Sequence, residues 1–428
     1  CDKEQLRSTL DELLPRDVDV KDNEGGQIES IYYQHRTLGK AHIYFLANTD
    51  QSRSHEATIC LRGEGRVEEW DPVKGSMREV ACRTENGYTT LENAFPQTGS
   101  LLLVLDTSKR AKQRRGHEET VVSAIDLQDT WGIRRMNYNA LTLDYCQYKF
   151  GGGAWSEFVP VWKAQREAEK LDKNVRASLR YAFRTEFTKR KQRRIYVVME
   201  APERYDITIN GRKIGYEGAG WWVDISFKKV DISKFVVNGE NALEVTCLFR
   251  RPTIPGTMVF LKDGVELESV YIIGDFAVKK AGERFILSDG TNTAHTGDLV
   301  QQGYPFYAGA VVYTQTIRAQ RADRIYLEFE SLDAIVTRVT INGKRAGTIA
   351  WRPYKLDISR LVKGGENTIE VEAVSSCRNL LGPHHHRRGE LLFVGPGSFS
   401  DESNWTEQYS FAKFGIGKAR LIRTRIER

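Results

Sequence analysis

Two stretches of this chain repeat each other: RIYVVMEAPERYDITINGRKIG at 194–215 and RIYLEFESLDAIVTRVTINGKRAG at 324–347. Each is followed by a second shared segment, VDISKFVVNGENALEVTC at 230–247 and LDISRLVKGGENTIEVEAV at 356–374. The copies lie farther apart than the roughly 20–50 residues that separate solenoid repeats, so a whole domain is duplicated. The protein is therefore modular, and its function depends on what this module does.

The pattern within each copy is typical of antiparallel β-structure. RIYVVME (194–200) and RIYLEFE (324–330) alternate apolar and polar residues, as strands with one buried face do. The Asn-Gly pairs at 210–211 and 342–343 tolerate the positive φ angles of a two-residue hairpin. Because no βαβ units separate these elements, the pattern favours β-sandwiches.

The remaining segments extend the all-β prediction. Between 28 and 106, short apolar runs recur at intervals of about ten residues with Gly, Pro, Asn and Asp at the joints, which predicts a small antiparallel sandwich. An amphipathic helix with a leucine stripe precedes it, and a helical excursion is predicted at 162–175. The predicted domains are an N-terminal helix and linker at 1–27, a small sandwich at 28–106, a basic linker at 107–119, a first jelly roll at 120–280 and a second at 281–428.

Composition narrows the classes of function. The chain has 428 residues, too many for one ordinary core, and a modest net charge of +6. Two basic runs, at 109–115 and 188–194, are interpreted as a solvated linker and turn, so nucleic acid is not expected as a partner. No apolar run reaches the length of a membrane-spanning helix, and no membrane partner is expected. The scattered cysteines predict neither a disulfide framework nor a zinc site.

The order of motifs in the repeat is similar to that of a known domain family. A strand, an Asn-Gly hairpin, a Trp-containing stretch, Asp-Ile-Ser and Gly-Glu-Asn follow one another. This order resembles the sugar-binding jelly roll of glycoside hydrolase family 2, a galactose-binding-like sandwich. The second copy is more similar, since it keeps AWRPYKLDISRLVKGGEN (350–367) compactly, whereas the first carries the insertion GYEGAGWWVDISFKK (215–229).

Other motifs lie outside the repeat. They are LLPRDVDV (13–20), HR (35–36) followed by IYFLANTD (43–50), EEWDP (68–72), QGYPFYAGAVVY (302–313) and RNLLGPHHH (378–386). They are similar to the C-terminal part of large family 106-like enzymes, the α-L-rhamnosidase group. In such enzymes a catalytic barrel precedes these sandwiches. Because this sequence starts at Cys1 and enters a helix almost at once, we expect a segment cut from a longer polypeptide.

No catalytic site is expected within the chain. Glycoside hydrolysis ordinarily needs two carboxyl groups that flank the scissile bond. None of the carboxylates stands in a recognisable catalytic setting, and Asp231 and Asp357 recur as part of the fold's own signature. The run Gly151-Gly152-Gly153 lacks the features of a phosphate loop, and no cofactor is expected.

Candidate carbohydrate-binding residues are tryptophans with their polar neighbours, and a histidine run. Aromatic rings stack on the flat C–H faces of sugars, although core packing is the commoner fate of Trp. Three adjacent histidines suit a metal, a domain contact or a saccharide, but a strand would place at most two on one face, so no metal site is predicted. The candidates are Trp221, Trp222, Trp351, Arg352, Tyr354, His384, His385 and His386.

We therefore expect a non-catalytic accessory portion of a glycoside hydrolase that braces the catalytic barrel and binds saccharide. Its expected partners are a saccharide ligand and a catalytic domain or separate catalytic chain. Two alternatives stay open: a free-standing carbohydrate-binding or adhesion protein, and a subunit that completes a hydrolase active site on another chain.

Overall fold

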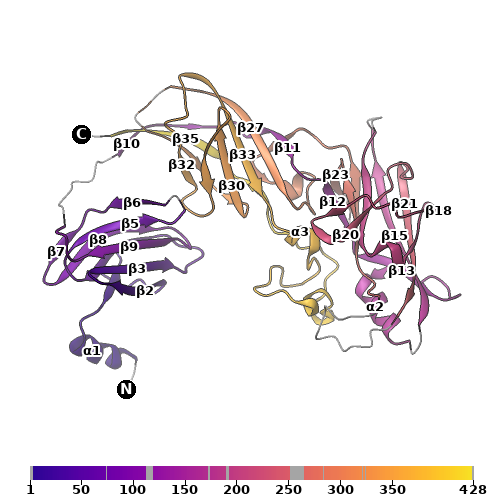
Figure 1. The fold of residues 1–428 in the computed structure, drawn as a ribbon, viewed down its shortest axis with the longest axis horizontal. Coiled ribbons are helices and arrows are strands. Elements are labelled where there is room, and N and C mark those ends of the chain that lie inside the picture. The colour runs from indigo at the N-terminus through magenta and orange to yellow at the C-terminus, as the bar shows by residue number, and fades with distance from the viewer. Residues whose placement is uncertain are drawn as a thin grey trace.

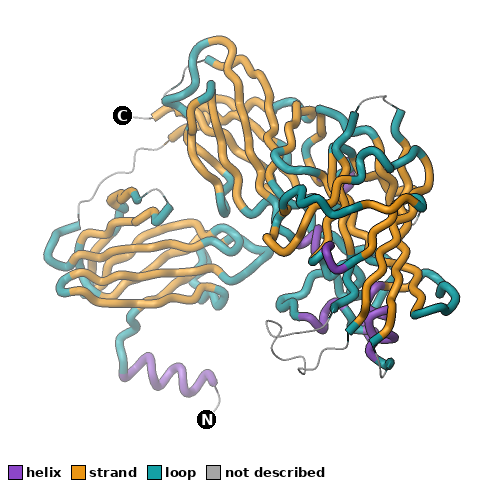
Figure 2. Tube along the Cα trace, turned by 45° about the vertical axis from the view of Figure 1, so that its right-hand side comes forward, coloured by secondary structure: helices purple, strands orange, loops and turns teal. Residues whose placement is uncertain are grey.

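The structure is a computed structural model, and it confirms the all-β sandwich prediction: antiparallel sheets dominate, with a few short helices (Figures 1 and 2). Parts of both basic runs, and residues 172–173 of the predicted helical excursion, lie outside the described residues. The described residues are 3–73, 75–111, 119–171, 174–188, 192–250, 265–282, 284–320, 322 and 324–426.

The N-terminal sandwich follows helix α1 (Lys3–Leu13) and consists of two sheets. Its core lies between them, where buried Tyr44 and Leu46 face Ile59 and Leu61. One sheet has the order β1 (Val18–Lys21), β4 (His55–Arg62), β8 (Tyr88–Phe95), β7 (Arg83–Glu85), and the other β2 (Ile31–Leu38), β3 (Ala41–Asn48), β9 (Ser100–Asp106), β5 (Arg66–Asp71), β6 (Ser76–Glu79).

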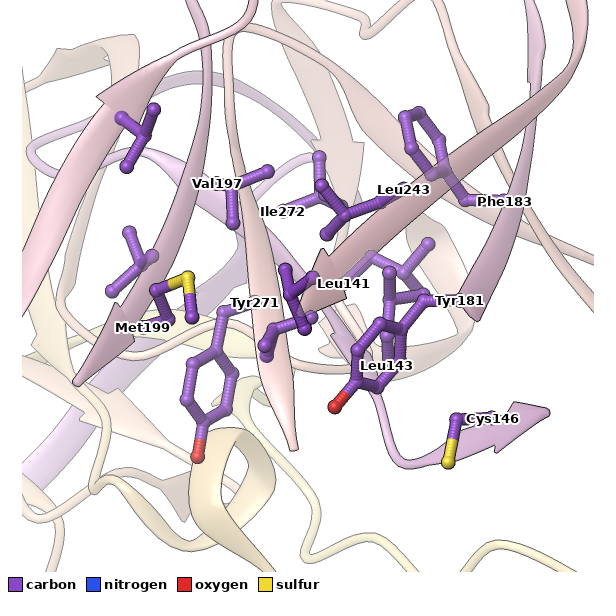
Figure 3. Packing of buried hydrophobic residues seen from close by; sticks show 14 of the residues in the cluster. Leu141, Leu143, Cys146, Tyr181, Phe183, Val197, Met199, Leu243, Tyr271 and Ile272 are labelled. Atoms are coloured by element: carbon purple, nitrogen blue, oxygen red, sulfur yellow. The ribbon is translucent and has the colours of Figure 1, made fainter. Parts of the chain in front are cut away.

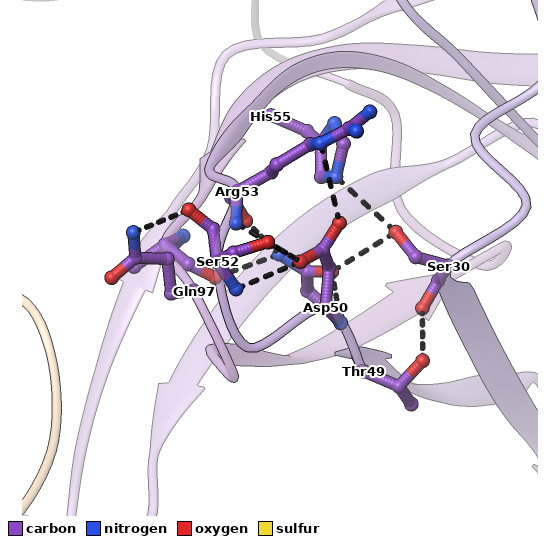
Figure 4. Close-up of polar contacts among 9 residues, drawn as sticks. Ser30, Thr49, Asp50, Ser52, Arg53, His55 and Gln97 are labelled. Carbon is purple, nitrogen blue, oxygen red and sulfur yellow. Dashed lines mark hydrogen bonds and ion pairs between the residues drawn. The ribbon is translucent and has the colours of Figure 1, made fainter.

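Hydrogen bonds at one end of the N-terminal sandwich fix the β3–β4 connection (Figure 4). Asp50 Oδ1 accepts from the backbone N–H of Ser52 at 2.8 Å and of Arg53 at 3.0 Å. Gln97 Nε2 donates to the Ser52 carbonyl at 2.7 Å. The backbone N–H of Ser52 also holds the pKa of Asp50 below its usual range. Since the cluster satisfies its own polar groups, we interpret it as structural.

The middle sandwich contains the largest of the three hydrophobic cores in the described residues (Figure 3). Helix α2 (Val161–Glu169) packs at its side. In the figure, Tyr271 extends from the core toward the C-terminal segment. One sheet has the order β12 (Asn139–Leu143), β22 (Val270–Gly274), β16 (Ile195–Glu200), β20 (Asp224–Asp231), β19 (Trp221–Trp222). The other has β14 (Val159–Pro160), β13 (Tyr145–Phe150), β15 (Val175–Glu186), β21 (Gly239–Phe249), β17 (Asp206–Ile209), β18 (Arg212–Ile214), extended by β24 (Arg284–Ser288) and β23 (Ala277–Ala281).

The C-terminal sandwich is built in the same way around a third core, in which Trp131, Tyr307 and Tyr313 are buried. One sheet has the order β25 (Thr293–His295), β11 (Thr130–Arg135), β27 (Ala310–Ala319), β33 (Gly365–Val374), β30 (Val336–Ile341), β31 (Lys344–Ile349). The other has β10 (Glu119–Asp126), β35 (Ala419–Ile426), β28 (Arg324–Phe329), β32 (Lys355–Asp357), and β26 (Gly297–Asp298), β34 (Gly415–Ile416) and β29 (Leu332–Asp333) form a small third sheet.

The chain enters the C-terminal sandwich before it builds the middle one. β10 pairs antiparallel with β35, and β11 pairs with β27. The predicted jelly-roll range 120–280 therefore includes two strands whose partners lie in the 281–428 segment. Conversely, β24 follows residue 280 yet pairs in parallel with β15 of the middle sandwich. Partners this remote in sequence leave no local signal.

The repeated Asn-Gly pairs form the predicted hairpins. Asn210 and Gly211 have φ angles of 49° and 75°, and Asn342 and Gly343 have 52° and 76°. Positive φ at both central residues is the geometry of a type I′ turn, whose twist matches the flanking strands. The turns join β17 to β18 and β30 to β31. The prediction of a two-residue hairpin is therefore confirmed in both copies.

The Gly-Glu-Asn motif also has a structural explanation. The Asn241 side chain accepts from the Val237 N–H at 2.8 Å and donates to the Val237 and Gly239 carbonyls. Asn367 makes the same three bonds in the second copy, to Lys363 and Gly365. Both asparagines are buried. Because buried polar groups must be paired, this shared network explains why the motif recurs.

After β33, the chain leaves the C-terminal sandwich and returns at β34. This excursion, residues 375–414, contains α3 (Arg378–Leu381) and the short 3₁₀ turns Pro396–Phe399 and Glu402–Asn404. Further 3₁₀ turns among the described residues are Pro202–Arg204 and Leu299–Gln302. The excursion is the yellow segment beside α2 in Figure 1. Thr142 Oγ1 of β12 donates to the Leu380 carbonyl at 2.8 Å, which anchors the excursion to the middle sandwich.

Candidate functional site

A cleft of about 640 Å³ lies where the excursion meets the middle sandwich. One wall is α2, which contributes Trp162, Arg166 and Glu169. A second wall comes from the sheet that contains β16 and β22, and the excursion supplies the third. The cleft therefore forms only because segments distant in sequence are folded together.

Asp144, directly after β12, is the polar centre of one cleft wall. Tyr409 donates its hydroxyl proton to Asp144 Oδ1 at 2.6 Å. Nε2 of His385 lies 3.1 Å from Asp144 Oδ2, and Nδ1 of His384 lies 3.7 Å from the same oxygen. Burial by itself raises the pKa of Asp144, but the hydrogen bonds and charges of the two histidines hold it well below its usual range. Asp144 is thus a buried carboxylate.

His385 is held on both sides. Its Nδ1 lies 2.9 Å from the Thr406 carbonyl, while its Nε2 faces Asp144. Both partners offer oxygen atoms, so both ring nitrogens of His385 are engaged. Its ring also stacks on Trp405, with 4.6 Å between ring centroids. The side chain is therefore fixed, and it stabilises the Asp144 carboxylate.

The other two histidines are also buried and have partners. His384 Nε2 lies 2.9 Å from the Asn379 carbonyl. His386 Nδ1 accepts from the Arg388 N–H at 3.2 Å, and its Nε2 lies 3.7 Å from Asp401. All three imidazoles are more than 90% buried. Within the described residues, no group of three or more His, Cys, Asp or Glu side chains is placed to hold a metal ion.

Aromatic rings also line the cleft. Trp162 and Trp405 meet edge to face, with ring centroids 5.4 Å apart. Phe227 packs on Tyr271 at 5.4 Å. The Arg166 guanidinium lies 4.6 Å from the Trp162 ring centroid, a cation–π contact that fixes this side chain. The cleft thus combines flat apolar walls with hydrogen-bonding groups.

Two carboxylates in the cleft bond to neutral side chains. Glu169 Oε1 accepts from Gln165 Nε2 at 2.7 Å, and Glu200 Oε1 accepts from Ser226 Oγ at 3.0 Å. Glu266 and Glu268 also line the cleft. Such carboxylates accept hydrogen bonds from hydroxyl groups of a ligand.

The structure separates the predicted site residues into two groups. His384 and His385 line the cleft. Trp222 is buried, and its ring centroid lies 6.5 Å from that of the cleft residue Tyr271. Its neighbour Trp221 is 55% exposed and does not line the cleft. The carbohydrate-binding role of these residues stays a prediction.

The remaining candidates lie on the C-terminal sandwich. Trp351 is 54% exposed, directly after β31. The Arg352 guanidinium lies 4.7 Å from the ring centroid of Tyr354, and Tyr354 packs against the core. None of the three lines the cleft. Their carbohydrate-binding role is likewise untested and stays a prediction.

Several cleft residues carried no signal that marked them in the sequence. Asp144 follows an apolar strand, and Tyr409 stands in an irregular segment. Trp405 lies in an Asn-Trp-Thr triplet at 404–406, a short motif that gives no indication of a cleft. The usable signal was the helical excursion predicted at 162–175 inside an all-β pattern, since α2 forms one wall of the cleft. Trp162 is on that helix.

Comparisons with known proteins place the chain near glycosidases. A scan against protein-family models finds no match. A putative beta-glucuronidase from Formosa agariphila is 29% identical over 85 residues, which are 19% of this chain and 7% of that protein. A rhamnosidase from Novosphingobium sp. PP1Y aligns over 98% of this chain and 26% of its own, at 14% identity and a TM-score of 0.42. The Streptomyces avermitilis alpha-L-rhamnosidase complexed with L-rhamnose aligns over 95% of this chain and 36% of its own, at 11% identity and a TM-score of 0.27.

The chain thus spans 7% of the curated relative's length and 26% and 36% of the two solved structures. Over these lengths the chain is similar to a putative beta-glucuronidase and to two rhamnosidases. None of the described helices is both long and apolar enough to cross a membrane.

Proposed function

We propose that this chain is a non-catalytic accessory portion of a glycoside hydrolase and that its cleft binds saccharide. The observation that carries the proposal is the composition of the cleft walls, with Trp162, Phe227 and Tyr271 beside the carboxylates of Glu169 and Glu200. Aromatic rings suit the flat C–H faces of a sugar, and carboxylates accept hydrogen bonds from its hydroxyls. The volume of about 640 Å³ lies within the range of small-ligand sites.

The state of Asp144 argues against a role as general acid. A general acid for glycoside hydrolysis needs a raised pKa, so that it keeps a proton at neutral pH. The pKa of Asp144 is lowered instead, and both of its oxygens already have partners. Asp144 therefore serves to hold the excursion in place.

A bracing role is favoured by apolar surface at the other end of the molecule. In α1, the leucines Leu6, Leu10 and Leu13 are each at least 46% exposed. The helix stands away from the N-terminal sandwich in Figures 1 and 2. An 11-residue helix is marginal in water by itself, so its apolar stripe suits contact with another domain. We propose that a catalytic domain covers it.

The test of saccharide binding is calorimetric titration of the purified chain with neutral oligosaccharides that contain rhamnose, galactose or glucose. We expect binding by at least one, and a tenfold or greater loss in Trp162→Ala, since stacking contributes about 1.4 kcal/mol or more. Trp70→Ala, at an exposed tryptophan of the N-terminal sandwich, is the matched control and keeps full affinity. Binding by no member of the panel contradicts the proposal, and so does a loss confined to the control.

The test of the non-catalytic role is turnover of aryl glycosides by the same preparation. We expect no release of the aryl group above the uncatalysed rate. Turnover that disappears in a single carboxylate variant, such as Glu200→Gln, contradicts this part of the proposal and favours an active site within the chain.

A further inference from the structure

One stretch of the excursion, residues 391–399, leaves apolar side chains in water beside the cleft, and we call it the tip segment. Leu392 and Phe393 are 93% and 89% exposed, and Val394 next to them is 51% exposed. Among the described residues, the recorded hydrogen bonds of the tip segment stay within 395–400. Consecutive apolar side chains without a packing partner usually mark a contact surface.

Both ends of the tip segment are fixed. Before it, Glu390 pairs with Nε of Arg378 at 2.7 Å. After it, the Ser400 carbonyl accepts a hydrogen bond from the Arg166 guanidinium at 2.9 Å. Ser400 and Arg166 both line the cleft. The tip segment is therefore a loop whose second anchor belongs to the cleft itself.

The second half of the tip segment already forms part of the cleft. Residues 396–399 line it, whereas residues 391–395 do not. Phe393 precedes Pro396 by three residues, and three residues span at most about 10 Å. The apolar side chains at 392–394 are therefore within reach of the cleft mouth.

Glycines separate the apolar residues from the cleft wall. A Cβ atom added to Gly395 or Gly397 would meet no heavy atom within 4 Å, so no neighbour constrains the backbone at either position. Glycine also adopts more backbone conformations than any other residue. A few such positions are enough to absorb the change of φ and ψ that a closing loop requires.

We infer that the tip segment closes over a saccharide bound in the cleft and places Leu392 and Phe393 on the apolar C–H face of the sugar. The inference rests on the proposed function, because it concerns the same ligand. The two side chains leave water only when a sugar is present, so closure is coupled to binding. A closed tip segment delays release, since the ligand leaves only after the loop opens.

The experiment compares the native chain with the double variant Leu392→Ser/Phe393→Ser. Both are titrated with a neutral oligosaccharide that binds the native chain, and NMR line-shape analysis gives the dissociation rate. We expect the variant to bind about tenfold more weakly, mainly through faster dissociation. The matched control, Tyr32→Ser/Leu38→Ser, removes two exposed apolar side chains from β2 of the N-terminal sandwich and keeps the native affinity.

A second measurement uses the native chain alone. Chymotrypsin cleaves after exposed Leu and Phe, and we expect cleavage at 392–393 to slow about fivefold or more when the oligosaccharide saturates the chain. Equal cleavage with and without saccharide overturns the inference, and so does unchanged affinity of the double variant. In both cases the proposed function stands, because the native chain binds. Absence of binding by the native chain overturns both.

Discussion

Single residues of the repeat contribute through backbone hydrogen bonds. Asn241 and Asn367 each close a turn by accepting one N–H and donating to two carbonyls. Asn210 and Asn342, at the hairpins, bond to these same asparagines at 2.9 and 2.8 Å. These asparagines, the most recognisable residues of the duplication, are therefore required for folding. They give no information about ligand chemistry.

The first prediction concerns this network. Asn367→Ala leaves a buried N–H and buried carbonyls without partners, so it should lower the free energy of unfolding by about 2–4 kcal/mol. Glu366→Ala, at the exposed neighbour that pairs with Arg318 at 3.6 Å, should cost about 0.5 kcal/mol or less. Urea titration followed by tryptophan fluorescence measures both. Equal losses in the two variants would show that the network is not the reason for the motif.

A second prediction at this scale concerns Asp144 and pH. Its folded-state pKa is depressed, so its contribution to stability is present above the ordinary pKa and is lost as pH falls through the folded value. Asp144→Asn should therefore cost about 1–3 kcal/mol near neutral pH, since it removes the carboxylate that accepts from Tyr409 and contacts His385. The difference from the native protein should shrink below about pH 4, near the ordinary pKa of an aspartate. A difference that stays constant down to pH 3 in denaturant titrations would contradict the role of the ionised Asp144 carboxylate.

Among the elements, α1 differs from the rest because it buries little. Its leucines are exposed, whereas the strands of all three sandwiches bury alternate side chains. Leu10→Ser should therefore change the free energy of unfolding of this chain by about 0.5 kcal/mol or less. Hydrogen exchange should show α1 amides opening at close to zero free energy and those of β15 and β21 near the global value. Strong protection of α1 would mean that it already has a partner within this chain.

The strands also show which parts of the fold could be predicted from the sequence. Alternation and Asn-Gly pairs predict the repeated strands and hairpins because both signals are local. The membership of β10 and β11 in the C-terminal sandwich has no local signal, since their partners β35 and β27 lie far along the chain. The same holds for the cleft. His384 and His385 belong to a histidine run that is visible in the sequence, but their partner Asp144 lies more than half the chain away and is part of no motif.

At the scale of the whole molecule, the middle and C-terminal sandwiches are interlocked, whereas the N-terminal sandwich has its own core. β10 and β11 precede the middle sandwich but belong to the C-terminal one, and the excursion returns from the C-terminal sandwich to contact β12. Residues 119–428 should therefore fold as one unit, while a segment that starts at 139 should not, because β35 and β27 would lose edge partners. Circular dichroism melts and amide NMR dispersion distinguish the two. A well-folded 139–428 segment would contradict the interlocking.

The central claim is that saccharide enters the cleft between α2, the middle sandwich and the excursion. The most direct measurement follows the indole N–H resonances of the tryptophans while a neutral oligosaccharide that binds in calorimetry is added to the ¹⁵N-labelled chain. We predict saturable shifts at Trp162 and Trp405, which line the cleft, with Trp221 and Trp351 unchanged. Shifts confined to Trp221 or Trp351, with Trp162 and Trp405 unmoved, would place the sugar on an exposed sandwich surface and contradict the account.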